Sequence, residues 1–116
     1  MKHNGSCHCG KVKYEVENLN LQESITCNCS MCQRKGTVLS FVPAMSFKLL
    51  TDKKYLTDYQ FGKKMIHHLF CSTCGVTSFA EGKSPDGTAM IAINLRCIDN
   101  LDLGTIFSKQ IDGRSF

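Results

Sequence analysis

Seven of the eight cysteines in this 116-residue chain stand in three short clusters. The clusters read C-x-C at residues 7–9, C-x-C-x-x-C at residues 27–32 and C-x-x-C-G at residues 71–75, and Cys97 stands alone. Cysteine thiolates at these spacings are the donors that a tetrahedral Zn²⁺ ion takes in proteins. The sequence therefore predicts a zinc-binding protein.

Two of the clusters are pairs, each suited to one half of a closed site. In an extended C-x-C, both side chains lie on the same face of the chain, so both thiols can reach one ion. In the C-x-x-C-G cluster, Gly75 allows the backbone to turn tightly beneath a metal. Two such pairs, far apart in the sequence, make a closed four-cysteine site, and the free energy of metal binding then becomes part of the free energy of folding.

The middle cluster differs because it places three thiols within six residues. Three protein ligands leave a fourth position for water or substrate, which is the arrangement of catalytic zinc. An ion with an open position can also hold an incoming thiol as its thiolate, the nucleophilic form. Spacing alone leaves open which clusters share an ion. A closed second site, completed by Cys97 or by a histidine, is the alternative.

Short segments with alternating or apolar patterns, separated by frequent turn residues, must position these clusters. They predict a single, mainly β domain over residues 1–116. One helical turn is expected at Ser30–Lys35, where Gly36 would end it, and Pro43 is expected at a sheet edge or at a break in a strand. The expected strands are residues 11–17, 40–44, 47–50, 55–61, 65–70, 88–95 and 105–108.

Composition and charge exclude several classes of protein. No apolar run approaches the roughly 18 residues of a membrane-spanning helix, and the polar N-terminal residues hold no secretory h-region. We therefore expect a cytoplasmic protein with no membrane partner, in which cysteines bind metal rather than form the disulfides of a secreted scaffold. The formal charge of +4 includes no basic block, and metal-bound thiolates would cancel most of it, so nucleic acid is not an expected partner.

The order of the cysteine clusters and their flanking residues resembles one known family. Gly5–Val12, Cys27–Gly36, Phe70–Gly75 and Ile93–Asp99 are together similar to the glutathione-dependent formaldehyde-activating enzymes, a family that includes the centromere protein V-like proteins. The resemblance implies a zinc-stapled, β-tent-like fold of short antiparallel strands. It also implies a structural zinc on Cys7, Cys9, Cys71 and Cys74, and a second, catalytic zinc on Cys27, Cys29 and Cys32.

The resemblance also implies a function for the second zinc. In the reaction that names the family, glutathione adds to formaldehyde to give S-hydroxymethylglutathione, which is classed as carbon–sulfur lyase chemistry. The leading hypothesis is therefore a zinc-dependent carbon–sulfur lyase that acts on a small thiol or a thiol–aldehyde adduct, with the substrate sulfur at the open three-cysteine zinc. The alternatives are a non-catalytic zinc scaffold that binds a partner and a redox or metal-buffering protein, in which the middle cluster forms disulfides reversibly.

Three basic residues are candidates to hold the carboxylates of an anionic thiol such as glutathione. Arg34, Lys35 and Arg96 flank the middle cluster or Cys97, and the planar fork of arginine suits carboxylates in particular. The alternative is that all three are solvated surface charges.

The histidines and the isolated cysteine have less specific patterns. His67 and His68 precede Cys71 on an expected strand, so one should face inward and the other outward. His8 lies between two ligands and should point away from their metal. Cys97 is expected either as a small buried side chain or as an alternate ligand.

Overall fold

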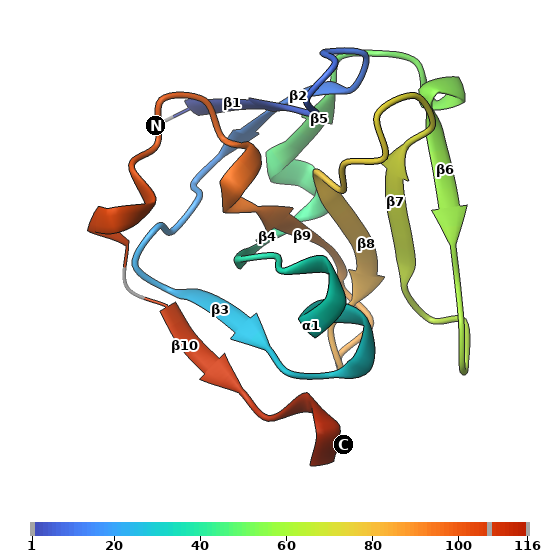
Figure 1. Ribbon diagram of the computed structural model, residues 1–116, viewed down its shortest axis with the longest axis vertical. Coiled ribbons are helices and arrows are strands. Elements are labelled where there is room, and N and C mark those ends of the chain that lie inside the picture. Colours follow the sequence, from blue (N-terminus) through green and yellow to red (C-terminus); the bar gives the residue numbers. More distant parts are fainter. Residues whose placement is uncertain (1, 107, 116) are drawn as a thin grey trace.

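Two β-sheets, one short helix and several 3-10 turns make up the computed structural model, which describes residues 2–106 and 108–115 (Figure 1). The smaller sheet has the strand order β1-β2-β5, with β1 at Lys2–Ser6, β2 at Lys13–Glu17 and β5 at Phe47–Leu49. The larger sheet has the order β10-β3-β4-β9-β8-β7-β6. Its strands are β10 at Ser108–Ile111, β3 at Ser24–Cys27, β4 at Leu39–Pro43, β9 at Ala89–Asn94, β8 at Phe79–Lys83, β7 at His67–Cys71 and β6 at Leu56–Tyr59.

Alternation along the strands explains how the sheets bury their apolar residues. In β2, Tyr14 and Val16 are buried while Lys13 and Glu17 are exposed, as the pleat of a strand requires. The same alternation in β9 sends Ile91 and Ile93 into the core. The prediction of a mainly β fold is confirmed. One pairing departs from the expected antiparallel pattern, because β10 runs parallel to β3.

An aromatic cluster joins the two sheets. Tyr14 of β2 and Phe47 of β5 meet Phe79 of β8, with ring centroids 5.2 Å apart for Tyr14–Phe47, 5.7 Å for Tyr14–Phe79 and 4.6 Å for Phe47–Phe79. The Tyr14 hydroxyl is buried and donates a hydrogen bond to the Ser78 carbonyl at 3.3 Å. Tilted and edge-on ring pairs at these distances add stabilisation beyond the apolar area that they bury.

Within residues 2–106 and 108–115, the single α-helix, α1, spans Ser30–Lys35 as predicted. Cys29 is the N-cap of this helix, and its thiol accepts a hydrogen bond from the Cys32 backbone N–H at 3.3 Å. The helix ends at Gly36, which adopts a left-handed conformation with φ of 68°, a geometry that glycine adopts without steric cost. In the described part of the chain, no helix is long and apolar enough to cross a membrane.

Among the residues that the structure describes, the remaining elements are five 3-10 turns: η1 at Ala44–Ser46, η2 at Lys53–Tyr55, η3 at Leu95–Cys97, η4 at Leu103–Thr105 and η5 at Gly113–Ser115. They explain two differences from the sequence prediction. Pro43 ends β4, an interior strand, and η1 follows directly, so the proline marks a strand break rather than a sheet edge. The prediction of a strand at residues 105–108 is wrong. Residue 105 is the last residue of η4, residue 107 lies outside the described part, and β10 begins only at Ser108.

Gly5 provides a test of the packing between β1 and β2. It pairs with Tyr14, and a Cβ atom at Gly5 would lie 2.5 Å from the Tyr14 ring. We expect Gly5→Ala to lower the free energy of unfolding by about 1–3 kcal/mol, because overpacking forces a buried ring to move. Urea denaturation measures this. The control is Gly82→Ala, where the nearest atom would be 3.6 Å away. Equal stability of the two variants would contradict the prediction.

Candidate metal centres and the adjoining pocket

Four cysteines from two distant turns converge on one point. Cys7 and Cys9 lie in the turn that joins β1 to β2, while Cys71 ends β7 and Cys74 lies in the turn that follows it. Their four sulfur atoms all lie within 4.8 Å of one another. The Cys9 sulfur is 3.6 Å from the sulfurs of both Cys7 and Cys71. Four thiols so close together can hold a soft metal ion in tetrahedral geometry.

Backbone N–H groups surround this four-cysteine group. The Cys71 sulfur accepts hydrogen bonds from the N–H groups of Thr73 at 3.4 Å and Cys74 at 3.5 Å, and the Cys7 sulfur accepts one from Val12 at 3.4 Å. The N–H of Cys74, followed by that of Thr73, lowers the pKa of the Cys71 thiol, because a donor stabilises the thiolate. The turn thus favours the deprotonated form that binds metal.

The second group combines three thiols from one short segment. Cys27 ends β3, Cys29 precedes α1 and Cys32 lies in the first turn of α1, and their sulfur atoms also lie within 4.8 Å of one another. Burial, with a further contribution from Cys29, raises the pKa of Cys32 to about 12. A metal ion bound here would therefore displace a proton from Cys32 as it binds. All three donors are soft thiols, so this group too can hold a soft divalent ion.

The C-terminal segment fixes the loop that carries these three thiols. The Asn28 side chain donates to Asp112 Oδ1 at 2.9 Å and accepts from the Arg114 N–H at 3.1 Å, while its backbone N–H donates to the Ile111 carbonyl at 3.1 Å. The Arg114 guanidinium donates to the Asn28 carbonyl at 2.9 Å and to Gln33 Oε1. Strand β10 lies alongside β3 and leads this segment to the loop (Figure 1).

Gly113 approaches the three-cysteine group so closely that no larger residue fits. A Cβ atom at this position would overlap the Cys27 sulfur and lie 3.0 Å from Cys29 Cβ. The backbone of the C-terminal segment therefore forms one wall of this candidate metal site. A wall of this kind limits how far the thiols can move and holds them ready for a metal ion.

A pocket of about 570 Å³ opens beside the three-cysteine group. It lies on the face of the large sheet that carries Met90, Ala92 and Asn94, whereas Ile91 and Ile93 of the same strand point into the core. Its size falls in the range of small-molecule sites. Its polar and ionisable lining residues are Cys27, Cys29, Cys32, Lys35, Thr37, His68, Thr77, Glu81, Lys83, Ser84 and Asn94, and its large apolar ones are Ile25, Met31, Leu39, Phe41, Phe61, Ile66, Phe79, Met90 and Ile111.

Of the three basic residues considered for binding carboxylates, Lys35 lines this pocket and Arg34 and Arg96 do not. Arg34 instead donates back to the Ser30 carbonyl of its own helix at 3.0 Å. Lys35 is half-buried, and burial lowers the pKa of its ammonium group, while the Cys32 thiolate opposes that shift. One cation therefore stands at the end of α1 that faces the pocket.

Cys97 lies outside both cysteine groups in the described part of the chain. Its thiol donates to the Thr77 carbonyl at 3.7 Å and accepts from Asn94 Nδ2 at 3.7 Å. Burial raises the pKa of the Cys97 thiol, which keeps it in the unreactive, protonated form. These contacts favour the expectation of a small, partly buried side chain over that of an alternate ligand.

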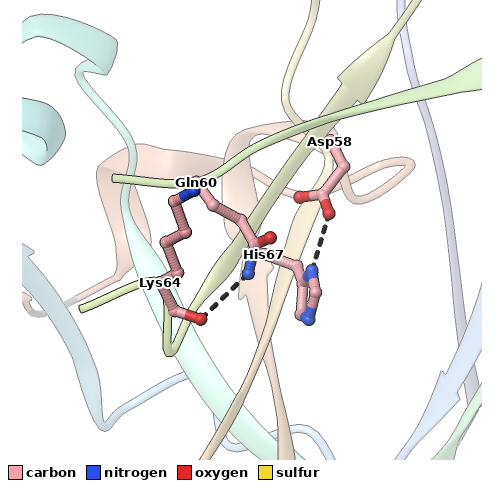
Figure 2. A network of polar contacts seen from close by, with 4 residues as sticks. All are labelled: Asp58, Gln60, Lys64 and His67. Atoms are coloured by element: carbon pink, nitrogen blue, oxygen red, sulfur yellow. Dashed lines mark hydrogen bonds and ion pairs between the residues drawn. The ribbon is translucent and has the colours of Figure 1, made fainter. Parts of the chain in front are cut away.

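The histidines follow the alternation expected of a strand. His67 is exposed on β7 and pairs with Asp58 of β6, with Nδ1 2.7 Å from Oδ2. Figure 2 shows the His67 ring directed at Asp58, and the Gln60 side chain donating to the Lys64 carbonyl in the turn between the two strands. His68 points the other way, is 9% exposed and lines the pocket. His8 is exposed and belongs to neither cysteine group.

The fold and these two groups define a class of small β proteins with a four-thiol and a three-thiol group, each able to hold a metal ion. Residues 2–110 match the family model described as glutathione-dependent formaldehyde-activating enzyme, and the chain belongs to this family. A crystal structure of a Rhodobacter sphaeroides protein, a structural genomics target, is similar with a TM-score of 0.81 and 28% identity, over 92% of this chain and 97% of that one. Family membership implies glutathione-dependent formaldehyde activation as the associated chemistry.

Sequence reasoning missed the residues that support the second group. Asn28 was inside the recognised cluster, but its partners Asp112 and Arg114 lie 84 and 86 residues further along the chain. The polar run that follows Ile111 was a weak signal, because a glycine between two charged residues is typical of any surface turn. Contact between a turn and a distant loop depends on the sheet order, which local patterns do not contain.

Replacing Cys74 tests the four-cysteine group. We expect Cys74→Ser to lose one metal ion per chain and more than about 3 kcal/mol of unfolding free energy, because loss of a metal is among the large single-residue effects. Elemental analysis and thermal denaturation measure the two quantities. The control Cys97→Ser should keep both values, since serine can reproduce its hydrogen bonds. Full metal content in Cys74→Ser would count against the site.

Replacing Arg114 tests the support of the three-cysteine group. We expect Arg114→Ala to weaken metal binding there by about 10–100-fold, the usual effect of removing a residue that orients a ligand. Competition with a chelator of known affinity measures the loss, and the four-cysteine group serves as an internal reference. Arg96→Ala, which removes an exposed arginine outside the pocket, should bind both metals as the unmodified protein does. An unaltered affinity in Arg114→Ala would refute the supporting role.

Proposed function

We propose that this chain catalyses the addition of a small thiol to an aldehyde, or the reverse cleavage of the adduct, in the pocket beside Cys27, Cys29 and Cys32. Glutathione and formaldehyde are the substrates that family membership suggests. The observation that carries the proposal is that all three thiols line a pocket of about 570 Å³. A scaffold protein would have no need to leave such a space beside a metal group.

The proposal assigns different tasks to the two metal groups. Cys7, Cys9, Cys71 and Cys74 would hold a structural zinc, since two of these four residues, Cys7 and Cys71, are buried and the group has its full complement of ligands. Cys27, Cys29 and Cys32 would hold a second zinc with room for a further ligand. When bound, a zinc ion there supplies Lewis acidity that lowers the pKa of a thiol coordinated to it.

The chain's own residues would bind and orient the substrate. Phe41, Phe61 and Ile66 line the pocket although each is more than 40% exposed. They would exclude water from the reacting carbonyl when substrate covers them. Lys35 would pair with a substrate carboxylate, because a half-buried ammonium ion gains most from an opposite charge. These contacts would place a thiol and an aldehyde together, which replaces a bimolecular encounter by an oriented one.

The chain would act as one domain, because the strands that carry both metal groups belong to two sheets with a shared core. Strand β7 contributes to both places: Cys71 joins the four-cysteine group and His68 lines the pocket. The structural zinc would therefore support the wall of the pocket as well as the fold.

The test of the proposal is the variant Cys29→Ser. We expect it to lose one of two bound metal ions and to reduce adduct formation from glutathione and formaldehyde by at least about 100-fold, because the metal-bound thiolate is no longer available. Metal content and the rate of adduct formation, followed by NMR, measure the effects. Cys97→Ser is the matched control. Unchanged activity together with the loss of one metal ion would overturn the mechanism.

A further inference from the structure

One buried imidazole lines the same pocket as the three-cysteine group. His68 is the second residue of β7, pairs in register with Tyr59 of β6 and is 9% exposed. Its ring stacks on Phe61 with the centroids 5.2 Å apart and the planes 21° from parallel. Phe61 in turn stacks on Tyr59 at 5.8 Å. The imidazole is thus packed against an aromatic ring, and both rings belong to the lining of the cavity.

This imidazole has polar atoms that the protein itself does not use. Among the residues that the structure describes, no side chain or backbone group forms a hydrogen bond with either ring nitrogen of His68. The neighbouring His67, by contrast, is bonded to Asp58 at 2.7 Å. Among the described residues, Ser78 Oγ is the fully buried side-chain N or O atom without a hydrogen-bond partner, so the unpaired ring nitrogens of His68 keep some access to solvent. The pocket is the place from which a partner for His68 can come.

The charges around His68 favour its neutral form. Burial and the nearby Lys35 ammonium both lower the pKa of His68 below its ordinary value of 6.5, and Asp58 opposes them. Glu81 of β8, Lys83 and the three thiols also line the same pocket. A neutral imidazole has one nitrogen free to accept a proton at neutral pH, which is the state that a general base requires.

We propose that His68 is the acid–base residue of the thiol–aldehyde reaction in this pocket, an inference that rests on the proposed function. In the forward direction, the Nδ1 or Nε2 atom that lacks a proton accepts the proton of the substrate thiol. The sulfur electron pair forms the carbon–sulfur bond, and the C=O π pair moves onto oxygen. His68 then returns its proton to that oxygen, which yields the neutral hemithioacetal, an S-hydroxymethyl group when the aldehyde is formaldehyde. No electrons are gained or lost overall.

The experiment compares His68→Gln with His67→Gln in the metal-loaded protein. The two histidines are adjacent on one strand, but His67 faces away from this pocket and pairs with Asp58. We expect His68→Gln to lower kcat by about 100–10,000-fold, the usual contribution of a general base, with both metals retained. We expect His67→Gln to retain kcat. Glutamine keeps much of the side-chain volume, and circular dichroism together with metal content verifies folding.

The pH profile separates a catalytic from a structural role. In the unmodified protein, kcat should fall as the pH drops below the lowered pKa of His68, because protonation removes the base. In His68→Gln, the residual rate should lack this acidic limb. The variant His68→Ala should regain part of its rate in added imidazole, which a purely structural role would not produce.

The outcomes distinguish this inference from the proposal on which it rests. If the unmodified, metal-loaded protein forms no adduct from any thiol and aldehyde tried, both proposals fail. If it is active and His68→Gln retains its rate, or loses its rate with an unchanged pH profile and no rescue by imidazole, only the role of His68 is overturned. A loss of rate in His67→Gln as large as that in His68→Gln would overturn it equally.

Discussion

The contact on which the rest of the structure depends is the meeting of Tyr14, Phe47 and Phe79 between the two sheets. Each sheet alone has one apolar face that must be covered, and these rings cover the junction. The Tyr14 hydroxyl also donates a hydrogen bond to the carbonyl of Ser78, the residue directly before β8. The relative placement of the sheets decides where each cysteine-bearing turn lies. The geometry of both cysteine groups therefore depends on this aromatic contact.

Strand β7 joins structural and chemical roles within five residues. Its last residue, Cys71, belongs to the four-cysteine group, and its second residue, His68, lines the pocket. Because neighbouring residues of a strand point to opposite faces, the same strand presents His67 to Asp58 on its other side. One short strand therefore connects the four-cysteine group with the pocket where we propose that the reaction takes place.

The sequence predicted the parts of the structure that local patterns encode. The short helix and its glycine end, the alternation of His67 and His68, and the strands around Tyr14 and Ile91 all follow from neighbouring residues. Strands β1, β3 and β8 went unrecognised because they are short and mix polar with apolar residues, and are held in place by their neighbours in the sheet. Spacing identified the cysteine clusters, but only the tertiary structure brings Cys7 and Cys9 to Cys71 and Cys74, since pairing across that distance is not a local property.

The parallel pairing of β10 with β3 has a consequence for how the protein is made. Synthesis proceeds from the N-terminus, so the four thiols of the first group are all present in the growing chain once Cys74 has left the ribosome. The loop of the three-cysteine group is synthesised early, but the hydrogen-bond partners of Asn28 are synthesised later. Asp112 follows it by 84 residues and Arg114 by 86 residues. A parallel contact between such distant segments forms late because chain entropy opposes it. The order of translation thus separates the completion of the two cysteine groups in time, and the three-cysteine group is completed last.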